Sequence, residues 1–387
     1  MIKSLTAYTE EIDEVEEAVA DILQQLDIEN NLLTHSAGII TCYSEFTKTG
    51  IIEALCARLP FPVVGTTTLG VAMSEQSGMF MFGIVVFTSD DTMFSAALSG
   101  SLSENGLSQP IADVYARAAA ALPAPPSLMF TFAPMLFQFT GDQYVQALDE
   151  ASSGVPNFGT VVIDHTFDYR EARVICNGET VQDGMAVLLL SGEVSPAFCM
   201  VSIEKNKLWR QSAIVTDSED NLLKEVNNLP FTQFMETLGL AKGSVIEPGS
   251  VMFPFVLDYN DGSQPVVRAY LAASPEGYGI CGGFMPVGSK LSIATIDRND
   301  VLSTTATALS RITREIGDRT LLSFSCIGRN LALGADSTAE MQLLVDTLGD
   351  SHPYLFAYSG GEICPVVSEN GQTVNRFHND TFVACLL

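Results

Sequence analysis

Three segments of the sequence follow one plan, and this internal repeat constrains the fold more than any other feature. Each segment has an apolar strand, a helix and a second apolar strand, with similar gaps between the two strands. We place them at 32–35, 49–59 and 62–67, then at 128–132, 142–151 and 157–164, and finally at 321–326, 338–348 and 354–358. Connections of this length favour right-handed crossovers between parallel strands.

Apolar, hairpin-like strands follow each segment. They are expected at 79–87 and 93–98, at 173–176, 185–190 and 197–203, and at 381–386, with turns at Asn177-Gly178 and at 369–371. The pattern therefore predicts an α/β fold of mixed parallel and antiparallel sheets with helices packed on them. It is built from repeated β-loop-α-β units followed by antiparallel hairpins.

The stretch between the second and third units differs, because prolines punctuate short strands there, including one at 252–257. Apolar strand gives way to a polar, charged stretch near residue 205. We therefore predict two α/β domains, at 1–205 and 206–387.

Composition excludes several functional classes. Hydrophobic residues make up 47% of the 387 residues, which argues against disorder. Acidic residues outnumber basic ones 46 to 19, so binding to nucleic acid or to an anionic membrane is not expected. The longest apolar stretch, 118–137, contains four prolines and does not suit a membrane-spanning helix. Eight cysteines without a C-x-x-C pair indicate reduced thiols and a cytoplasmic location.

Motifs for cofactors and metals are not convincing. Residues 277–282 fit G-x-G-x-x-G, but glycines and a proline follow where a helix would have to start, so nucleotide binding is not expected. The four histidines have no metal-ligand spacing. We expect neither a cofactor nor a metal.

The third unit carries the densest polar chemistry, at the ends of its two parallel strands. Such ends meet at one edge of an open α/β sheet, where ligands bind. A charged residue follows each strand, Arg329 after the first and Glu362 after the second, and glycines beside Glu362 would let a ligand approach the backbone closely. The predicted ligand-binding residues are Cys326, Gly328, Arg329, Ser359, Gly360, Gly361, Glu362 and Asn379. A structural ion pair between Arg329 and Glu362 is the alternative.

The other two units offer less charge at their strand ends. Secondary candidates are His35, Thr66, Thr67, Asp164, His165 and, from the third unit, His378. Asp164 and His165 are adjacent, and consecutive residues on a strand point to opposite faces, which disfavours a shared acid–base role.

Motifs in both halves of the chain resemble the FIST family, which pairs a FIST N domain with a FIST C domain. The resemblance rests on residues 61–68 and 157–159 in the first half, and on Cys326-Ile327-Gly328-Arg329, Glu340, residues 358–363 and 377–381 in the second. The sequence departs from the family pattern at Leu69-Gly70-Val71, where the family often has Gly-Glu-Ile. The resemblance implies a sensory module for small ligands such as amino acids, acting in signal transduction.

These observations leave three hypotheses. In the first, a cytoplasmic sensory protein without catalysis binds a zwitterion, with Arg329 on its carboxylate and Glu362 on its ammonium, and signals through a protein partner. In the second, Cys326 is the nucleophile and His378 the base of an enzyme. In the third, the chain is a protein-interaction scaffold.

Overall fold

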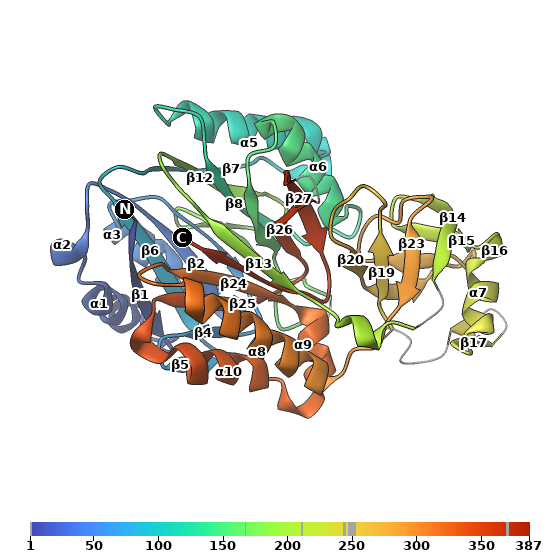
Figure 1. The fold of residues 1–387 in the computed structure, drawn as a ribbon. Helices are drawn as coiled ribbons and strands as arrows, with labels where there is room; N and C mark the ends of the chain where they lie inside the picture. Colours follow the sequence, from blue (N-terminus) through green and yellow to red (C-terminus); the bar gives the residue numbers. More distant parts are fainter. Residues whose placement is uncertain (1, 167, 210–211, 243–244, 247–252, 369–370) are drawn as a thin grey trace.

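Three six-stranded sheets form the larger part of the protein (Figure 1). The computed structural model describes residues 2–387 except 167, 210–211, 243–244, 247–252 and 369–370. The first sheet contains β1 (Lys3–Thr9), β6 (Phe82–Ser89), β2 (His35–Cys42), β3 (Val63–Thr67), β10 (Val174–Cys176) and β11 (Glu179–Val181), in that order. The second contains β7 (Met93–Leu98), β12 (Ala186–Ser191), β8 (Leu128–Ala133), β9 (Asn157–Val161), β26 (Glu362–Val367) and β27 (Thr373–His378). The third contains β13 (Ala197–Val201), β28 (Phe382–Leu386), β24 (Leu321–Cys326), β25 (Tyr354–Ser359), β4 (Val71–Met73) and β5 (Gln76–Gly78).

The three sheets share one topology, which confirms the predicted repeat. In each sheet the central pair is parallel, β2 with β3, β8 with β9 and β24 with β25, and the other pairs are antiparallel. The crossover helices of the three units are α3 (Ile51–Arg58), α6 (Gly141–Ser152) and α10 (Ala339–Leu348). The mixed α/β fold class is therefore confirmed.

The hairpin that follows each unit pairs with the sheet of another unit. The hairpin β4–β5 follows the first unit but pairs with β25 of the third. The hairpin β10–β11 follows the second unit and pairs with β3 of the first, and β26–β27 follows the third and pairs with β9 of the second. This cyclic exchange ties the three sheets together through backbone hydrogen bonds.

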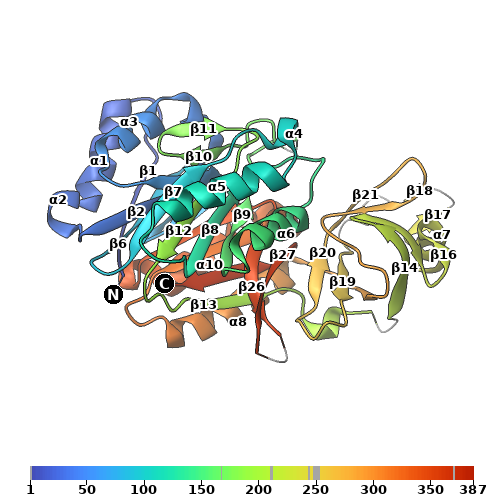
Figure 2. The ribbon, with the colours of Figure 1, turned by 90° about the horizontal axis from the view of Figure 1, so that it is seen from above.

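The sheets enclose a central core and bury their outer faces under helices (Figure 2). The central core contains Phe87 from the first sheet, Phe130 and Phe158 from the second and Phe324 from the third. The rings of Phe158 and Phe324 are stacked with centroids 5.6 Å apart. Outside, α1 (Val15–Leu26) and α3 cover the first sheet, α5 (Ser108–Ala120) and α6 the second, and α8 (Arg298–Glu315) and α10 the third. Strands buried on both faces explain the continuous apolar runs in the sequence.

A separate lobe is inserted between β13 and α8, at the right of Figures 1 and 2. Its larger sheet contains β20 (Val266–Arg268), β19 (Phe255–Asp258), β23 (Lys290–Ile293), β14 (Ala213–Glu219), β15 (Leu222–Val226), β22 (Gly279–Cys281) and β21 (Tyr270–Ala273), with β16 (Leu229–Pro230) paired to β15. The lobe also has α7 (Phe231–Thr237) and the pair β17 (Ala241–Lys242) and β18 (Val245–Ile246), and it has its own apolar core.

Short helices complete the structure at α2 (Ile28–Asn31), α4 (Leu102–Asn105) and α9 (Ile327–Leu333). The expected boundary at residues 205 and 206 lies in the turn η2 (Lys205–Lys207), where the chain enters the lobe. After the lobe, the chain returns to the second and third sheets through β24 to β28. No helix in the described part of the chain is both long and apolar enough to cross a membrane.

One strand prediction was wrong. The first strand of the first unit was placed at 32–35, but β2 begins at His35 and continues to Cys42. Residues 37–42 are buried whichever face of the sheet they point to. The alternation of apolar and polar residues that would mark the strand and its end is therefore missing. Met252 of the strand predicted at 252–257, and residues 369 and 370 of the predicted turn at 369–371, lie outside the described residues.

Two glycines sit where neighbouring parallel strands approach most closely. A Cβ on Gly159 of β9 would lie 1.9 Å from the carbonyl oxygen of Thr131 on β8, and a Cβ on Gly65 of β3 would lie 2.2 Å from that of Ile40 on β2. Backbone atoms cannot move aside as a flexible side chain can, so any side chain would force the central strands apart.

We therefore expect Gly159→Ala to lower the free energy of unfolding by about 3 kcal/mol, the upper end of the usual cost of overpacking. Urea unfolding followed by far-UV circular dichroism measures this loss, while the fluorescence of Trp209, the only tryptophan, follows the inserted lobe separately. Gly100→Ala is the control, because no neighbouring atom lies within 4 Å of its Cβ position. Equal stability of the two variants would contradict the close approach of β8 and β9.

Candidate functional site

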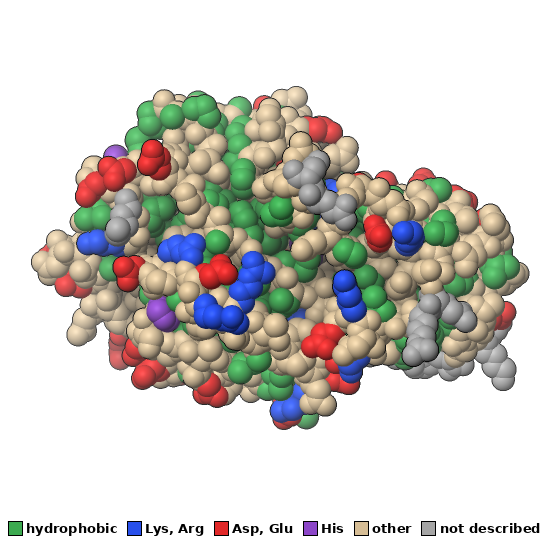
Figure 3. Space-filling view, in the orientation of Figure 1, with side chains coloured by type: hydrophobic (Ala, Val, Ile, Leu, Met, Phe, Trp, Pro, Cys, Tyr) green, Lys and Arg blue, Asp and Glu red, His purple; other side chains and the backbone are tan. Residues whose placement is uncertain are grey.

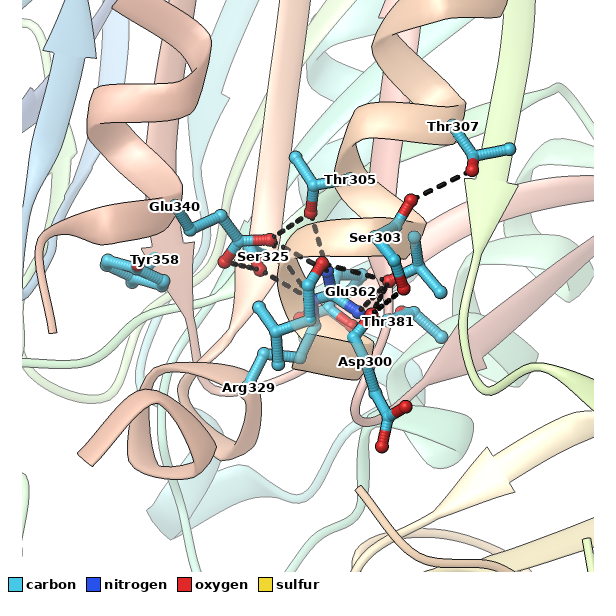
Figure 4. A network of polar contacts seen from close by, with 12 residues as sticks. Asp300, Ser303, Thr305, Thr307, Ser325, Arg329, Glu340, Tyr358, Glu362 and Thr381 are labelled. Atoms are coloured by element: carbon cyan, nitrogen blue, oxygen red, sulfur yellow. Dashed lines mark hydrogen bonds and ion pairs between the residues drawn. The ribbon is translucent and has the colours of Figure 1, made fainter. Parts of the chain in front are cut away.

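Arg329 is the centre of a buried polar network (Figure 4). It lies in α9, directly after β24, and its side chain turns back toward Ser325 at the end of that strand. The guanidinium donates to Glu340 of α10 at 2.8 Å, to the hydroxyl groups of Thr304 and Thr305 of α8, and to the carbonyl oxygen of Val301. Both Arg329 and Glu340 are fully buried.

Glu340 is satisfied in the same network. Its carboxylate also accepts hydrogen bonds from Thr305 at 2.6 Å and from Ser325 at 2.8 Å. The network thus joins β24, α8, α9 and α10, and it uses donors from all three nitrogens of the Arg329 guanidinium. We expected Arg329 to bind a ligand carboxylate or to pair with Glu362, and this expectation is corrected. The side chain of Arg329 points between α8 and α10, so its partner is Glu340.

Glu362 is a second buried carboxyl group, at the start of β26. It accepts hydrogen bonds from the hydroxyl groups of Ser359 and Thr381. Burial raises the pKa of Glu362 to about 8, against the lowering effect of these two hydrogen bonds, and nearby Asp380 raises it further. Glu362 is therefore largely protonated and neutral at pH 7.

The two glycines before Glu362 serve the junction between two sheets. The amide of Gly360 donates to the carbonyl oxygen of Val161 at 2.9 Å, and the amide of Val161 donates to that of Gly361 at 3.0 Å. Gly361 has φ of 135°, and a Cβ there would lie 2.2 Å from the ring of Phe377. The amide of Gly360, expected to contact a ligand, is thus bonded within the protein.

Asp380 is a third buried carboxyl group, in the turn between β27 and β28. Its Oδ1 atom lies over the Cα atom of Gly328, where a Cβ would come within 1.9 Å of it. Desolvation raises the pKa of Asp380 to about 6, although the charge of Arg329 opposes that rise. Among the described residues, no Lys, Arg or His lies within ion-pair distance of Asp380.

Asp380 lines a cavity of about 420 Å³ between the inserted lobe and the three-sheet body. The walls come from the loop 134–141 before α6, from β21 and β22 of the lobe, from α9 and from the turn after β27. Of the eight predicted ligand-binding residues, the cavity lining includes Cys326, Gly328, Gly360 and Asn379. The other four, Arg329, Ser359, Gly361 and Glu362, are buried beside it.

Two tyrosines in the lining have unused hydroxyl groups. Tyr144 of α6 and Tyr270 of β21 are 1% and 2% exposed. Each hydroxyl is buried without a hydrogen-bond partner in the described part of the chain. A buried polar group without a partner costs about 1–3 kcal/mol, and because both oxygens are buried they lie beneath the surface of the cavity.

A buried ion pair holds the lobe against the body beside the cavity. Arg268 of β20 is fully buried and donates to Asp142 of α6 at 2.8 Å and to the carbonyl oxygen of Phe377 at 2.8 Å. Asp142 also accepts from the amide of Phe284 at 2.8 Å. The cavity walls therefore depend on how the lobe docks.

Cys326 and His378 do not form a nucleophile–base pair. The imidazole Nε2 of His378 donates to the carbonyl oxygen of Cys364 at 3.1 Å, and neither described residue hydrogen-bonds the other. Burial raises the pKa of the Cys326 thiol, and the charges of Glu362 and Asp380 raise it further. Burial lowers the pKa of His378 to about 3. These shifts oppose formation of a thiolate–imidazolium pair.

The secondary candidates of the first two units lie elsewhere. His35 is at the start of β2, so it lies at the opposite end of that strand from the sheet edge expected for it. Thr67 is buried and donates to the carbonyl oxygen of Ile163 at 2.7 Å, while Thr66 donates to that of Thr67. Asp164 accepts from the amides of Thr166 and Glu171, and the ring of the exposed His165 contacts Ser44 at 3.0 Å.

Sequence reasoning missed the cavity residues that come from distant segments. Asp380 directly follows the predicted Asn379, and its type and position were a usable signal. Tyr144 and Tyr270 had no such signal, because they join the lining from α6 and β21, far in sequence from the strand ends of the third unit.

Comparison with known proteins places the chain by family. The sequence matches the FIST N domain over residues 36–229 and the FIST C domain over residues 221–365. No curated protein matches it. Among solved structures, a cyanuric acid hydrolase from A. caulinodans aligns over 100% of this chain and 99% of its own, with 9% identity and a TM-score of 0.39.

We expect Arg329→Met to lower the free energy of unfolding by about 3–5 kcal/mol, because it leaves the Glu340 carboxylate buried without its charge partner. The double variant Arg329→Met/Glu340→Leu should lose less than the sum of the two single changes, as a double-mutant cycle in urea measures. The control is Arg311→Met, which removes the exposed pair with Glu315 and should cost under about 1 kcal/mol. Equal losses in Arg329→Met and Arg311→Met would contradict a structural role for Arg329.

The raised pKa of Glu362 predicts a pH-dependent stability. The folded state holds a proton on Glu362 up to about pH 8, whereas the unfolded state releases it near 4.5, so stability falls as pH rises between these values. Asp380 contributes in the same direction, but only up to about pH 6. His378 acts oppositely, because its lowered pKa makes stability fall as pH drops below 6.5.

The interval from pH 6.5 to 8 therefore isolates Glu362 from the other two groups. We expect the free energy of unfolding to fall by about 2 kcal/mol across it, at about 1.4 kcal/mol for each pH unit. Urea unfolding at a series of pH values measures the slope. Glu362→Gln should flatten it, while Glu179→Gln, at an exposed position on β11, should leave it unchanged. A slope that survives Glu362→Gln would show that another group titrates.

Proposed function

Because the chain belongs to the FIST family, whose domains are associated with sensory signal transduction, we propose that it senses a small molecule bound in the cavity beneath the inserted lobe. The observation that carries the proposal is the carboxyl group of Asp380, which belongs to the lining of this cavity, is 4% exposed and forms no ion pair with a described residue. A volume of about 420 Å³ suits a metabolite of amino-acid size.

The walls of the cavity combine apolar contact with a few polar groups. Leu271 and Ile280 come from the lobe, and Met135 and Ile327 come from the body. Ligand sites typically have this composition, in which apolar walls give affinity and a few convergent polar groups give orientation.

A ligand in this position would touch both the lobe and the body. Asn379 of the body already links the two, because its Oδ1 atom accepts from the amide of Ala269 at 3.4 Å. Binding would favour the docked arrangement of the lobe over any other, which is a population shift that a protein partner could read. The proposal includes such a signalling partner.

The proposal also includes a cytoplasmic location and a non-catalytic role. All eight cysteines are free, which suits a reducing compartment. The high pKa of the Cys326 thiol and the distinct hydrogen bonding of His378 support binding over cysteine catalysis.

An amino acid is the ligand suggested by the sequence, and the site modifies how it would bind. Asp380 would take its ammonium group, while its carboxylate would have to rely on a neutral donor such as Asn379, since Arg329 is paired with Glu340.

The test is a thermal-shift screen of the full chain. The panel holds the twenty amino acids, the amines formed by removing their carboxyl groups and the acids formed by removing their amino groups. We expect at least one compound to raise the melting temperature by several degrees, because a ligand that binds only the folded state stabilises it.

Ala269→Phe fills the cavity and should abolish that shift. Ala273→Phe is the matched control, because it makes the same change at an exposed position of β21 that is not part of the lining, and it should keep the shift. No shift with any compound, or an equal shift in Ala269→Phe and the wild type, would overturn the proposal.

A further inference from the structure

Resting on that proposed function, we propose that the ligand is an organic cation, a protonated amine or quaternary ammonium group on an apolar body, whose charge lies between Asp380 and the aromatic rings of the cavity. The inference differs from the zwitterion expected from the sequence. It follows from the charges and the aromatic rings of the lining.

The described side chains of the cavity lining carry negative charge and no positive charge. Asp380 is the only charged side chain of the lining among the residues that the structure describes, and no Lys, Arg or His is part of it. Two arginines follow or precede lining residues, Arg329 after Gly328 and Arg268 before Ala269, and they are paired with Glu340 and Asp142. A ligand carboxylate would therefore enter an apolar cavity without a cation and beside a carboxyl group, which is a costly arrangement.

Asp380 itself needs a partner. Its carboxyl group is buried, and it forms no ion pair with a described residue. A bound cation would compensate this charge at short range in a site of low dielectric, where such an interaction is stronger than in water.

Aromatic rings supply a second attraction for a cation. Six aromatic side chains line the cavity: Phe137, Phe139, Tyr144, Tyr169, Tyr270 and Phe377. Phe139 and Tyr144 have ring centroids 6.4 Å apart, as have Phe137 and Tyr169. The negative face of an aromatic ring attracts an ammonium group, and Phe137, Phe139, Tyr144 and Tyr169 are the candidates, because the ring of Phe377 already contacts Arg268 and that of Tyr270 packs on Phe231 in the lobe.

The mouth and the surface of the molecule fit the same ligand. Phe137, Leu271 and Leu331 line the cavity and remain 79%, 55% and 49% exposed, so the entrance is apolar. Acidic and basic side chains are interspersed on the face in Figure 3, but the formal charge of the chain is −27. A strongly negative molecule raises the local concentration of cations and repels anions.

The experiment compares four probes that share a phenyl ring, by isothermal titration of the full chain. They are 2-phenylethylamine, phenyltrimethylammonium, L-phenylalanine and 3-phenylpropanoate, so their charges are positive, positive, zwitterionic and negative. We expect at least one cation to bind at least tenfold more tightly than phenylalanine, and 3-phenylpropanoate to show no binding. Equal or tighter binding of phenylalanine or of 3-phenylpropanoate would overturn the inference.

Two variants assign the effect to the cavity. Asp380→Asn removes the charge while keeping a residue that tolerates the positive φ of 50° at this turn, and it should weaken binding of the cation at least tenfold. Asp346→Asn, at an exposed position of α10, is the control and should leave binding unchanged.

The outcomes separate this inference from the proposed function. Suppose that a compound from the larger panel shifts the melting temperature of the wild type but not that of Ala269→Phe. If this compound is an anion or a zwitterion, and Asp380→Asn does not weaken its binding, the proposed sensory site stands but the inference of a cationic ligand is wrong. If Asp380→Asn binds the cation as tightly as the wild type does, the inference fails as well. A melting temperature of Asp380→Asn close to that of the wild type confirms that the variant folds.

Discussion

Each of the three sheets buries one face against the other two, and the rest of the structure depends on this shared core. The stacked rings of Phe158 and Phe324 join the second sheet to the third, and Phe87 brings in the first. Since the inner faces pack against each other, helices must cover the outer faces, and the central strands are then buried on both sides. The exchange of hairpins adds backbone hydrogen bonds to the apolar contact, so that no sheet is complete without strands from another unit.

Among the described residues, the buried charged groups around the strand ends of the third unit are hydrogen-bonded within the protein, with the exception of Asp380. Arg329 and Glu340 are buried together and satisfied by hydroxyl groups of α8 and of β24. Glu362 is satisfied by Ser359 and Thr381 and holds a proton. By contrast, Asp380 lines the cavity at the seam with the inserted lobe and forms no ion pair with a described residue. A site that leaves a buried carboxyl group without a charge partner in the free protein retains binding energy for a ligand, which is why function is inferred at the seam and not in the Arg329 network.

Local patterns predicted much of the fold correctly. The spacing of apolar residues predicted all three crossover units, and β24 and β7 agree with their predicted bounds residue for residue. The exception, β2, lies where burial on both faces removes the alternation that marks a strand. The hairpin exchange was out of reach, because pairing between β4 and β25 joins residues almost 300 positions apart and leaves no local signal.

The candidate site divides in the same way. The sequence by itself determined which chemistry stands at the strand ends of the third unit, since residue type and strand periodicity are local properties, and Cys326, Gly328, Gly360 and Asn379 do line the cavity. Only the tertiary structure decided which of the charged groups are available. Whether Arg329 faces a ligand or Glu340 depends on how α8 and α10 pack over the sheet, and whether Tyr270 reaches the cavity depends on where the lobe docks. Electrostatic and hydrogen-bonding roles are set by distances between segments remote in sequence, and the chain acquires those distances only when it folds.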